Sequence, residues 1–195
     1  MDIVQECTPQ GILSMKKTLL VTSLATIALF STASAFAADG NINFTGDIKD
    51  ATCEVDLAAG ATAISVPMGT LNKTAFSGAG STGTSSKFTI NLKNCPTAYT
   101  KANVEFDGTA AGNDKKILAL TAGTTAAPAA TGVGIQISDK SDTVLALKTP
   151  SASYDLKTGA TDVNKLDFSA RYVATSATVT SGVANSSATF NVKYN

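Results

Sequence analysis

Apolar and polar residues alternate along much of the chain. Apolar side chains recur at every second position in five runs, at residues 88–92, 104–106, 133–137, 166–172 and 188–194. A period of two is the pattern of a half-buried strand, with one face in a core and the other in water. Stretches rich in Gly, Ser and Thr separate the runs, as turns separate strands. The pattern therefore predicts one domain with an all-β sandwich fold.

One turn-rich stretch is also low in complexity. Residues 122–131 consist entirely of Ala, Gly, Thr and Pro. Such a composition offers few side chains for a core, so we expect a surface loop at this place and no domain boundary.

A further alternating run precedes the others. Ile42, Phe44 and Ile48 alternate with polar residues, and Gly46 takes the remaining position on the apolar face. A glycine inside a strand often marks a place where another backbone approaches closely. On pattern alone the run is either an ordinary first strand of the sandwich or an arm that pairs elsewhere.

The N-terminal region has the features of a secretory signal. Lys16 and Lys17 precede thirteen mostly apolar residues, and small residues follow as far as Ala37. This order predicts a signal peptide over residues 15–37 that is cleaved between Ala37 and Ala38. A membrane anchor over residues 19–38 is the alternative, but that stretch is rich in Ser and Thr and no basic residue follows it directly.

Residues 1–14 lie ahead of the basic residues with which a signal peptide begins. We expect Met15 to be the true start and residues 1–14 to be a misassigned upstream extension; a short genuine extension is the alternative. After cleavage, an arm over residues 38–50 would precede a domain over residues 51–195, which is an ordinary length for one domain.

Charge and cysteine content narrow the function and the compartment. The chain has 15 basic and 15 acidic residues, and Arg171 is its only arginine. Without a basic patch, no nucleic-acid partner is expected. Cys7 lies in the upstream segment, so Cys53 and Cys95 form an even pair in an exported chain, which predicts one disulfide. Closing that loop of about 43 residues would stabilise the fold by roughly 4 kcal/mol.

The chain contains no histidine and no tryptophan. Catalytic arrangements and metal sites that need histidine are therefore excluded. We expect no catalytic residue, no metal, no cofactor and no small-molecule substrate. Residues 78–83 match the Gly-x-Gly-x-x-Gly spacing of dinucleotide-binding turns, but they precede a predicted strand instead of opening a helix after one, so the match has no functional meaning.

Both ends of the predicted mature chain resemble a known family, the major subunits of chaperone–usher fimbriae (type 1 pilins). Residues 40–53 are similar to the family's opening, in which an apolar-x-Phe-x-Gly-x-apolar strand precedes a cysteine. Gly182, the fourteenth residue from the C-terminus, and the penultimate Tyr194 resemble the family's chaperone-recognition pattern. Similar segments lie between these ends, at residues 88–95, 132–139 and 170–174, so the resemblance covers residues 38–195.

The resemblance implies an incomplete immunoglobulin-like sandwich that lacks its last strand. In this family a periplasmic chaperone first fills the open groove with a strand, and the arm of another subunit replaces that strand at an outer-membrane usher. The resemblance assigns the donor strand to Ile42, Phe44, Gly46 and Ile48. It assigns the groove and the chaperone contact to Gly182, Phe190, Val192 and Tyr194.

The same resemblance implies a structural protein and not an enzyme, exported through the periplasm to a fimbria on the bacterial surface. Its expected partners are identical subunits, other fimbrial subunits, the chaperone and the usher. The arm favours a major subunit within the shaft. A minor adaptor or tip-associated subunit is the alternative, and a free secreted sandwich that closes on its own arm is a weaker one.

Overall fold

The computed structural model describes residues 43–45, 52–159 and 161–195 of the chain. The chain divides into two units, Met1–Gly46 and Asp47–Asn195. In the first unit the described residues have no regular secondary structure, and Phe44 is 91% exposed. Several predicted features lie outside the described residues: the signal peptide, its cleavage site at Ala37 and Ala38, and the donor-strand residues Ile42, Gly46 and Ile48.

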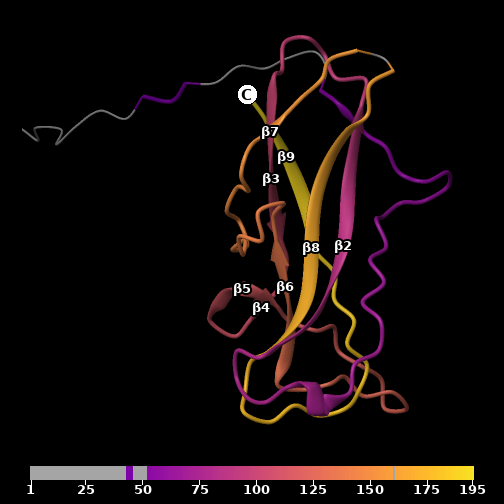
Figure 1. Cartoon of the computed structure of the whole chain (residues 1–195), viewed down its shortest axis with the longest axis vertical. Helices are drawn as coiled ribbons and strands as arrows, with labels where there is room; N and C mark the ends of the chain where they lie inside the picture. The colour runs from indigo at the N-terminus through magenta and orange to yellow at the C-terminus, as the bar shows by residue number, and fades with distance from the viewer. Residues whose placement is uncertain (1–42, 46–51, 160) are drawn as a thin grey trace, which may run out of the picture. The chain divides into compact units, whose positions relative to one another are not determined.

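Two antiparallel sheets form the second unit (Figure 1). The larger has the strand order β1-β2-β8-β6-β5-β4 and the smaller the order β7-β3-β9. The strands are β1 (Glu54–Val55), β2 (Thr82–Lys93), β3 (Lys101–Asp107), β4 (Ala110–Ala111), β5 (Asp114–Leu118), β6 (Val133–Ser138), β7 (Tyr154–Asp155), β8 (Asn164–Ala174) and β9 (Thr189–Tyr194). The predicted all-β fold is confirmed, and the five alternating runs lie in β2, β3, β6, β8 and β9.

The core lies between the sheets and is built from the apolar faces of these runs. β2 and β8 pair along most of their length, with Ile90 opposite Leu166. Both side chains are almost fully buried. From the smaller sheet, the ring of Phe106 packs edge-on against Phe168 of β8, with the ring centroids 5.1 Å apart. Period-two alternation thus delivers one face of each long strand to a shared core.

A disulfide joins Cys53 and Cys95. Cys53 directly precedes β1 and Cys95 follows the end of β2. Because β1 pairs with the last residues of β2, with Glu54 opposite Lys93, the chain brings the two cysteines together. The disulfide predicted from the sequence is therefore present, at one end of the larger sheet.

Helix is scarce in the part of the chain that the structure describes. The single helical element there is a 3-10 turn at Lys73–Ala75, in which the Asn72 side chain accepts a hydrogen bond from the backbone N–H of Thr74. None of the described segments is a helix of the length and hydrophobicity that a membrane crossing requires.

Tyr154 provides a test of the core. It is 5% exposed, and its hydroxyl donates a hydrogen bond to the Asp167 carbonyl oxygen over 2.6 Å. Burial raises the pKa of Tyr154 from 10.0 to about 12. The unfolded chain releases the Tyr154 hydroxyl proton at a lower pH than the folded chain. The stabilisation of the fold by the protonated Tyr154 hydroxyl is therefore complete below pH 10 and is lost as the pH rises through the folded pKa. We expect the free energy of unfolding to fall by about 2 kcal/mol from this group between those values.

Urea unfolding of the wild-type subunit and of Tyr154→Phe at several pH values between 9 and 12 measures this loss. The variant should be less stable at neutral pH, because it lacks the hydrogen bond, and its stability should depend less steeply on pH above 10. Equal slopes for the two proteins would contradict the assignment.

Candidate functional site

A cavity of about 1000 Å³ opens between the two sheets. Its floor consists of core side chains from both sheets, including Ile90 of β2, Ile135 of β6, Tyr172 of β8 and Phe106 of β3. Its volume is at the upper end of the range of ligand pockets, about 300–1000 Å³. The cavity is therefore an opening in the hydrophobic core itself, and we call it the groove.

One rim of the groove is the segment 62–69. Ile64, Val66 and Met68 are half-buried and pack against the core, whereas the residues between them are exposed. This is the burial pattern of a strand, although the segment is not part of either sheet. The Ser86 hydroxyl donates a hydrogen bond to the Pro67 carbonyl oxygen over 2.9 Å and ties the rim to β2.

A second rim is the segment 184–189, which leads into β9. Hydrogen bonds hold its backbone: the Tyr172 hydroxyl donates to the Ala184 carbonyl oxygen over 2.8 Å, and the Thr121 N–H donates to the Asn185 carbonyl oxygen over 2.7 Å. Burial raises the pKa of the Tyr172 hydroxyl. Among the described residues, no backbone hydrogen bond joins the two rims.

β9 borders the groove and has β3 as its one neighbour within the described sheets. Phe190, Val192 and Tyr194 are half-buried, and the residues between them are exposed. Phe190 lines the groove, with its ring centroid 6.5 Å from that of Phe106. A strand at a sheet edge offers backbone N–H and C=O groups for pairing. Beside an apolar groove, such an edge can accept a further strand whose alternate side chains fill the cavity.

The last residues of β9 are anchored at several points. The Tyr194 ring lies against Tyr99, with centroids 5.0 Å apart, and its hydroxyl donates to the Cys53 carbonyl oxygen over 3.4 Å. Burial raises the pKa of Tyr194. The Asn195 N–H donates to the Lys101 carbonyl oxygen over 2.9 Å. The end of β9 is therefore attached both to β3 and to the segment that carries the disulfide.

Gly182 has a different environment from the other predicted groove residues. The backbone beside it pairs with the predicted surface loop: the Val183 N–H donates to the Pro128 carbonyl oxygen, and the Ala130 N–H donates to the Val183 carbonyl oxygen, each over 2.9 Å. A Cβ atom on Gly182 would lie 2.6 Å from that Pro128 oxygen. Glycine is needed here because two backbones approach closely.

The predicted site residues thus lie at different places in the structure. Phe190 lines the groove, Val192 and Tyr194 continue along the same strand, and Gly182 packs against the loop. Phe44 is exposed, and the other predicted donor residues lie outside the described residues. No strand or groove residue was predicted within residues 62–69, although Ile64, Val66 and Met68 alternate there with exposed residues.

The chain is similar in sequence to known proteins over most of its length. Residues 42–195 match the family described as Fimbrial protein. The probable major fimbrial subunit LpfA of Escherichia coli O157:H7 is 39% identical, over 92% of this chain and 97% of its own length.

Two solved structures are similar in fold. A Burkholderia pseudomallei antigen and type I fimbria protein is 39% identical, with a TM-score of 0.52 over 80% of this chain and 97% of its own. The P pilus rod subunit PapA is 22% identical, with a TM-score of 0.59 over 74% of this chain and 100% of its own. These likenesses confirm the predicted sandwich that lacks its last strand.

The contact at Gly182 predicts the effect of added bulk. In Gly182→Ala the new methyl group meets the backbone of residues 128–130, which must shift. We expect the free energy of unfolding to fall by about 1–3 kcal/mol, as for other overpacked sites. The matched control is the neighbouring exposed residue, Ser181→Ala, which should change it by less than about 0.5 kcal/mol. Urea unfolding of both variants measures the difference, and equal midpoints would rule out the tight contact.

Proposed function

Since the chain belongs to the fimbrial protein family, we propose that it is the major subunit of a surface fimbria and polymerises by donor-strand exchange to build the shaft that supports adhesion. Family membership makes it a structural subunit of the cell surface and not an enzyme. The observation that carries the proposal is the apolar groove beside the edge strand β9.

The groove supplies the acceptor. A strand laid along β9 would form main-chain hydrogen bonds with it, and every second side chain would enter the cavity. Each large apolar side chain that is fully buried in this way contributes about 1.5–3 kcal/mol. The floor residues Phe106 and Ile135 and the rim residue Ile64 would then contact the incoming side chains. Completing the sheet and filling the core therefore occur in one step.

The N-terminal arm supplies the donor. Ile42, Phe44 and Ile48 would enter the groove of a neighbouring copy, and Gly46 would occupy a place where the acceptor leaves no room for a side chain. The 91% exposure of Phe44 supports this role, because a large apolar side chain gains most from a partner when its own unit leaves it in water. Since the donor and acceptor surfaces differ, each added subunit offers a new arm and the assembly grows as an open fibre.

Export and assembly require a signal peptide and a protein that protects the groove before polymerisation. We infer that the signal peptide over residues 15–37 directs export and is cleaved between Ala37 and Ala38. A periplasmic chaperone would cover the groove until an outer-membrane usher exchanges its strand for the arm of another subunit. Without a bound strand, the exposed apolar groove and the free edge of β9 would cause the subunits to aggregate.

A glycine substitution tests the donor strand. In Gly46→Phe the added ring should prevent the arm from seating, so that electron microscopy shows no fibres while the subunit still purifies with its chaperone. The matched control is Thr45→Phe, which places the same ring on the outward-facing side of the arm and should leave fibres intact. Normal fibres from Gly46→Phe would refute the donor-strand assignment.

A deletion strain separates the two roles within the fimbria. If the chain is the major subunit, electron microscopy of the strain shows no fibres at all. Fibres of normal length together with a loss of adhesion would instead identify a minor adaptor or tip-associated subunit.

A further inference from the structure

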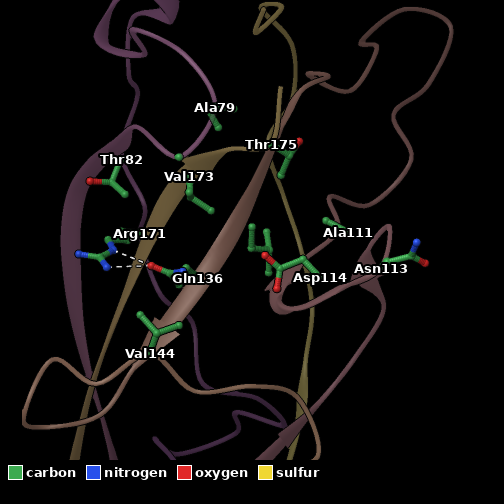
Figure 2. A pocket seen from close by; sticks show the side chains of 13 residues that line it. Ala79, Thr82, Ala111, Asn113, Asp114, Gln136, Val144, Arg171, Val173 and Thr175 are labelled. Carbon is green, nitrogen blue, oxygen red and sulfur yellow. Dashed lines mark hydrogen bonds between the residues drawn. The ribbon is translucent and has the colours of Figure 1, made fainter. Parts of the chain in front are cut away.

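The outer face of the larger sheet holds a second cavity, of about 580 Å³ (Figure 2). Strands β6 and β8 contribute side chains both to this cavity and to the floor of the groove. Ile135 and Tyr172 line the groove, whereas their neighbours Gln136 and Arg171 line the second cavity. Because successive side chains of a strand point to opposite faces, the two cavities lie on opposite sides of one sheet. A strand that fills the groove would leave the outer pocket uncovered.

The outer pocket combines an apolar floor with polar walls. Val173 and Ile117 line it although they are only 4% and 7% exposed, so they form its base. Arg171 and Asp114 lie on opposite sides of Gln136 in Figure 2. Its volume falls within the range of small-molecule pockets, about 300–1000 Å³, in which a few polar groups around an apolar surface fix the orientation of a ligand.

Arg171 is the only arginine of the chain, and its guanidinium is held in place. Its Nε and Nη2 both donate to Oε1 of Gln136, over 3.0 and 2.8 Å, across the β6–β8 pair. Among the described residues it has no ion-pair partner. Two of five N–H donors are thus used for positioning, which leaves donors for a ligand. A fixed guanidinium matches the oxygens of a carboxylate or a phosphate in a bidentate pair.

The opposite wall offers groups of another kind. Asp114 uses Oδ1 to accept the backbone N–H of Lys116 over 2.9 Å, and its carboxylate points toward Gln136 in Figure 2. Asn113 also lines the pocket, but its amide points away from Asp114. The Asp114 carboxylate can accept hydrogen bonds from the hydroxyl groups of a ligand. A small inorganic anion would satisfy Arg171 but would leave the apolar floor and Asp114 without contacts.

We propose that the outer pocket binds a carboxylated monosaccharide, as a ligand and not as a substrate. The sugar carboxylate pairs with Arg171, its hydroxyl groups donate to Asp114, and its carbon skeleton or an N-acetyl methyl group covers Val173 and Ile117. Insofar as the chain is a shaft subunit, which is the function proposed above, the site repeats along the fibre. Weak individual sites then act together on a surface that displays many acidic sugars.

Saturation-transfer NMR on isolated fibres tests the proposal with three free sugars: N-acetylneuraminic acid, its uncharged methyl ester and glucuronic acid. The two acids should give saturable signals. The ester should bind at least about tenfold more weakly, because it loses a charge-assisted pair. Electron microscopy first establishes whether fibres are present. If there are none, the proposed function has failed separately, and the same titration is made on the subunit purified with its chaperone.

Two variants locate the binding. Arg171→Gln should abolish the signals of both acids. Lys87→Gln, which removes the same charge from an exposed position on β2 outside the pocket, should keep them. Should Arg171→Gln fail to fold, the comparison of acid and ester on the wild-type protein decides alone.

Three outcomes would overturn the proposal: no saturable signal from either acid, equal binding of acid and ester, or full binding by Arg171→Gln. An absence of signal from wild-type fibres, combined with an altered fibre form in Arg171→Gln, would show that the pocket receives an acidic side chain of another subunit instead.

Discussion

Apolar side chains from both sheets face a groove of about 1000 Å³ that the described residues leave open. Both the stability of the domain and its capacity to associate depend on that opening. Close packing and the removal of apolar surface from water are the main sources of stability in a domain of this size. A core that lacks the side chains of one strand has less close packing and buries less apolar surface. The same shortfall that weakens a single subunit would supply the free energy for its association, because an incoming strand recovers the missing burial and the missing ladder of hydrogen bonds together. Stability and assembly are therefore two aspects of one packing defect.

An edge strand beside such an opening must be held by other means. β9 has one neighbour in its sheet among the described strands. Its C-terminal end is secured by the contact of Tyr194 with Tyr99 and with the Cys53 carbonyl oxygen, and its N-terminal approach is secured by the bonds of residues 184–186. The disulfide fixes Cys53 against the end of β2 and thereby positions the acceptor of the Tyr194 hydroxyl. The disulfide thus helps to hold the end of β9 in place, although the cysteines are far from Tyr194 in the sequence.

The sequence predicts the strands well and their arrangement less well, for a physical reason. Alternation reports which residues share a buried face, and this is why β2, β3, β6, β8 and β9 could be predicted. It does not report which backbone lies alongside. The rim at residues 62–69 alternates as a strand does, yet it belongs to neither sheet, so its pattern alone could not place it beside the groove. Gly182 was predicted as a groove residue, whereas its contact is with residues 128–130, which are more than fifty positions away. Long-range contacts of this kind arise from the tertiary fold and leave no local period.

The same alternation gives the larger sheet two surfaces with separate chemistry. Along β8, Ala170 and Tyr172 face the groove, whereas Arg171 and Val173 face the outer pocket. Substitutions at outward positions leave the apolar face of the strand unchanged, so the outer surface can vary in charge and shape without altering the fit of an incoming strand. Substitutions at inward positions have no such freedom, because each inner side chain packs against both the core and the groove. A polymer built in this way can keep one mode of assembly while its exposed face evolves other interactions. The residues around Arg171 lie on that exposed face, so their chemistry is independent of how the groove binds a strand.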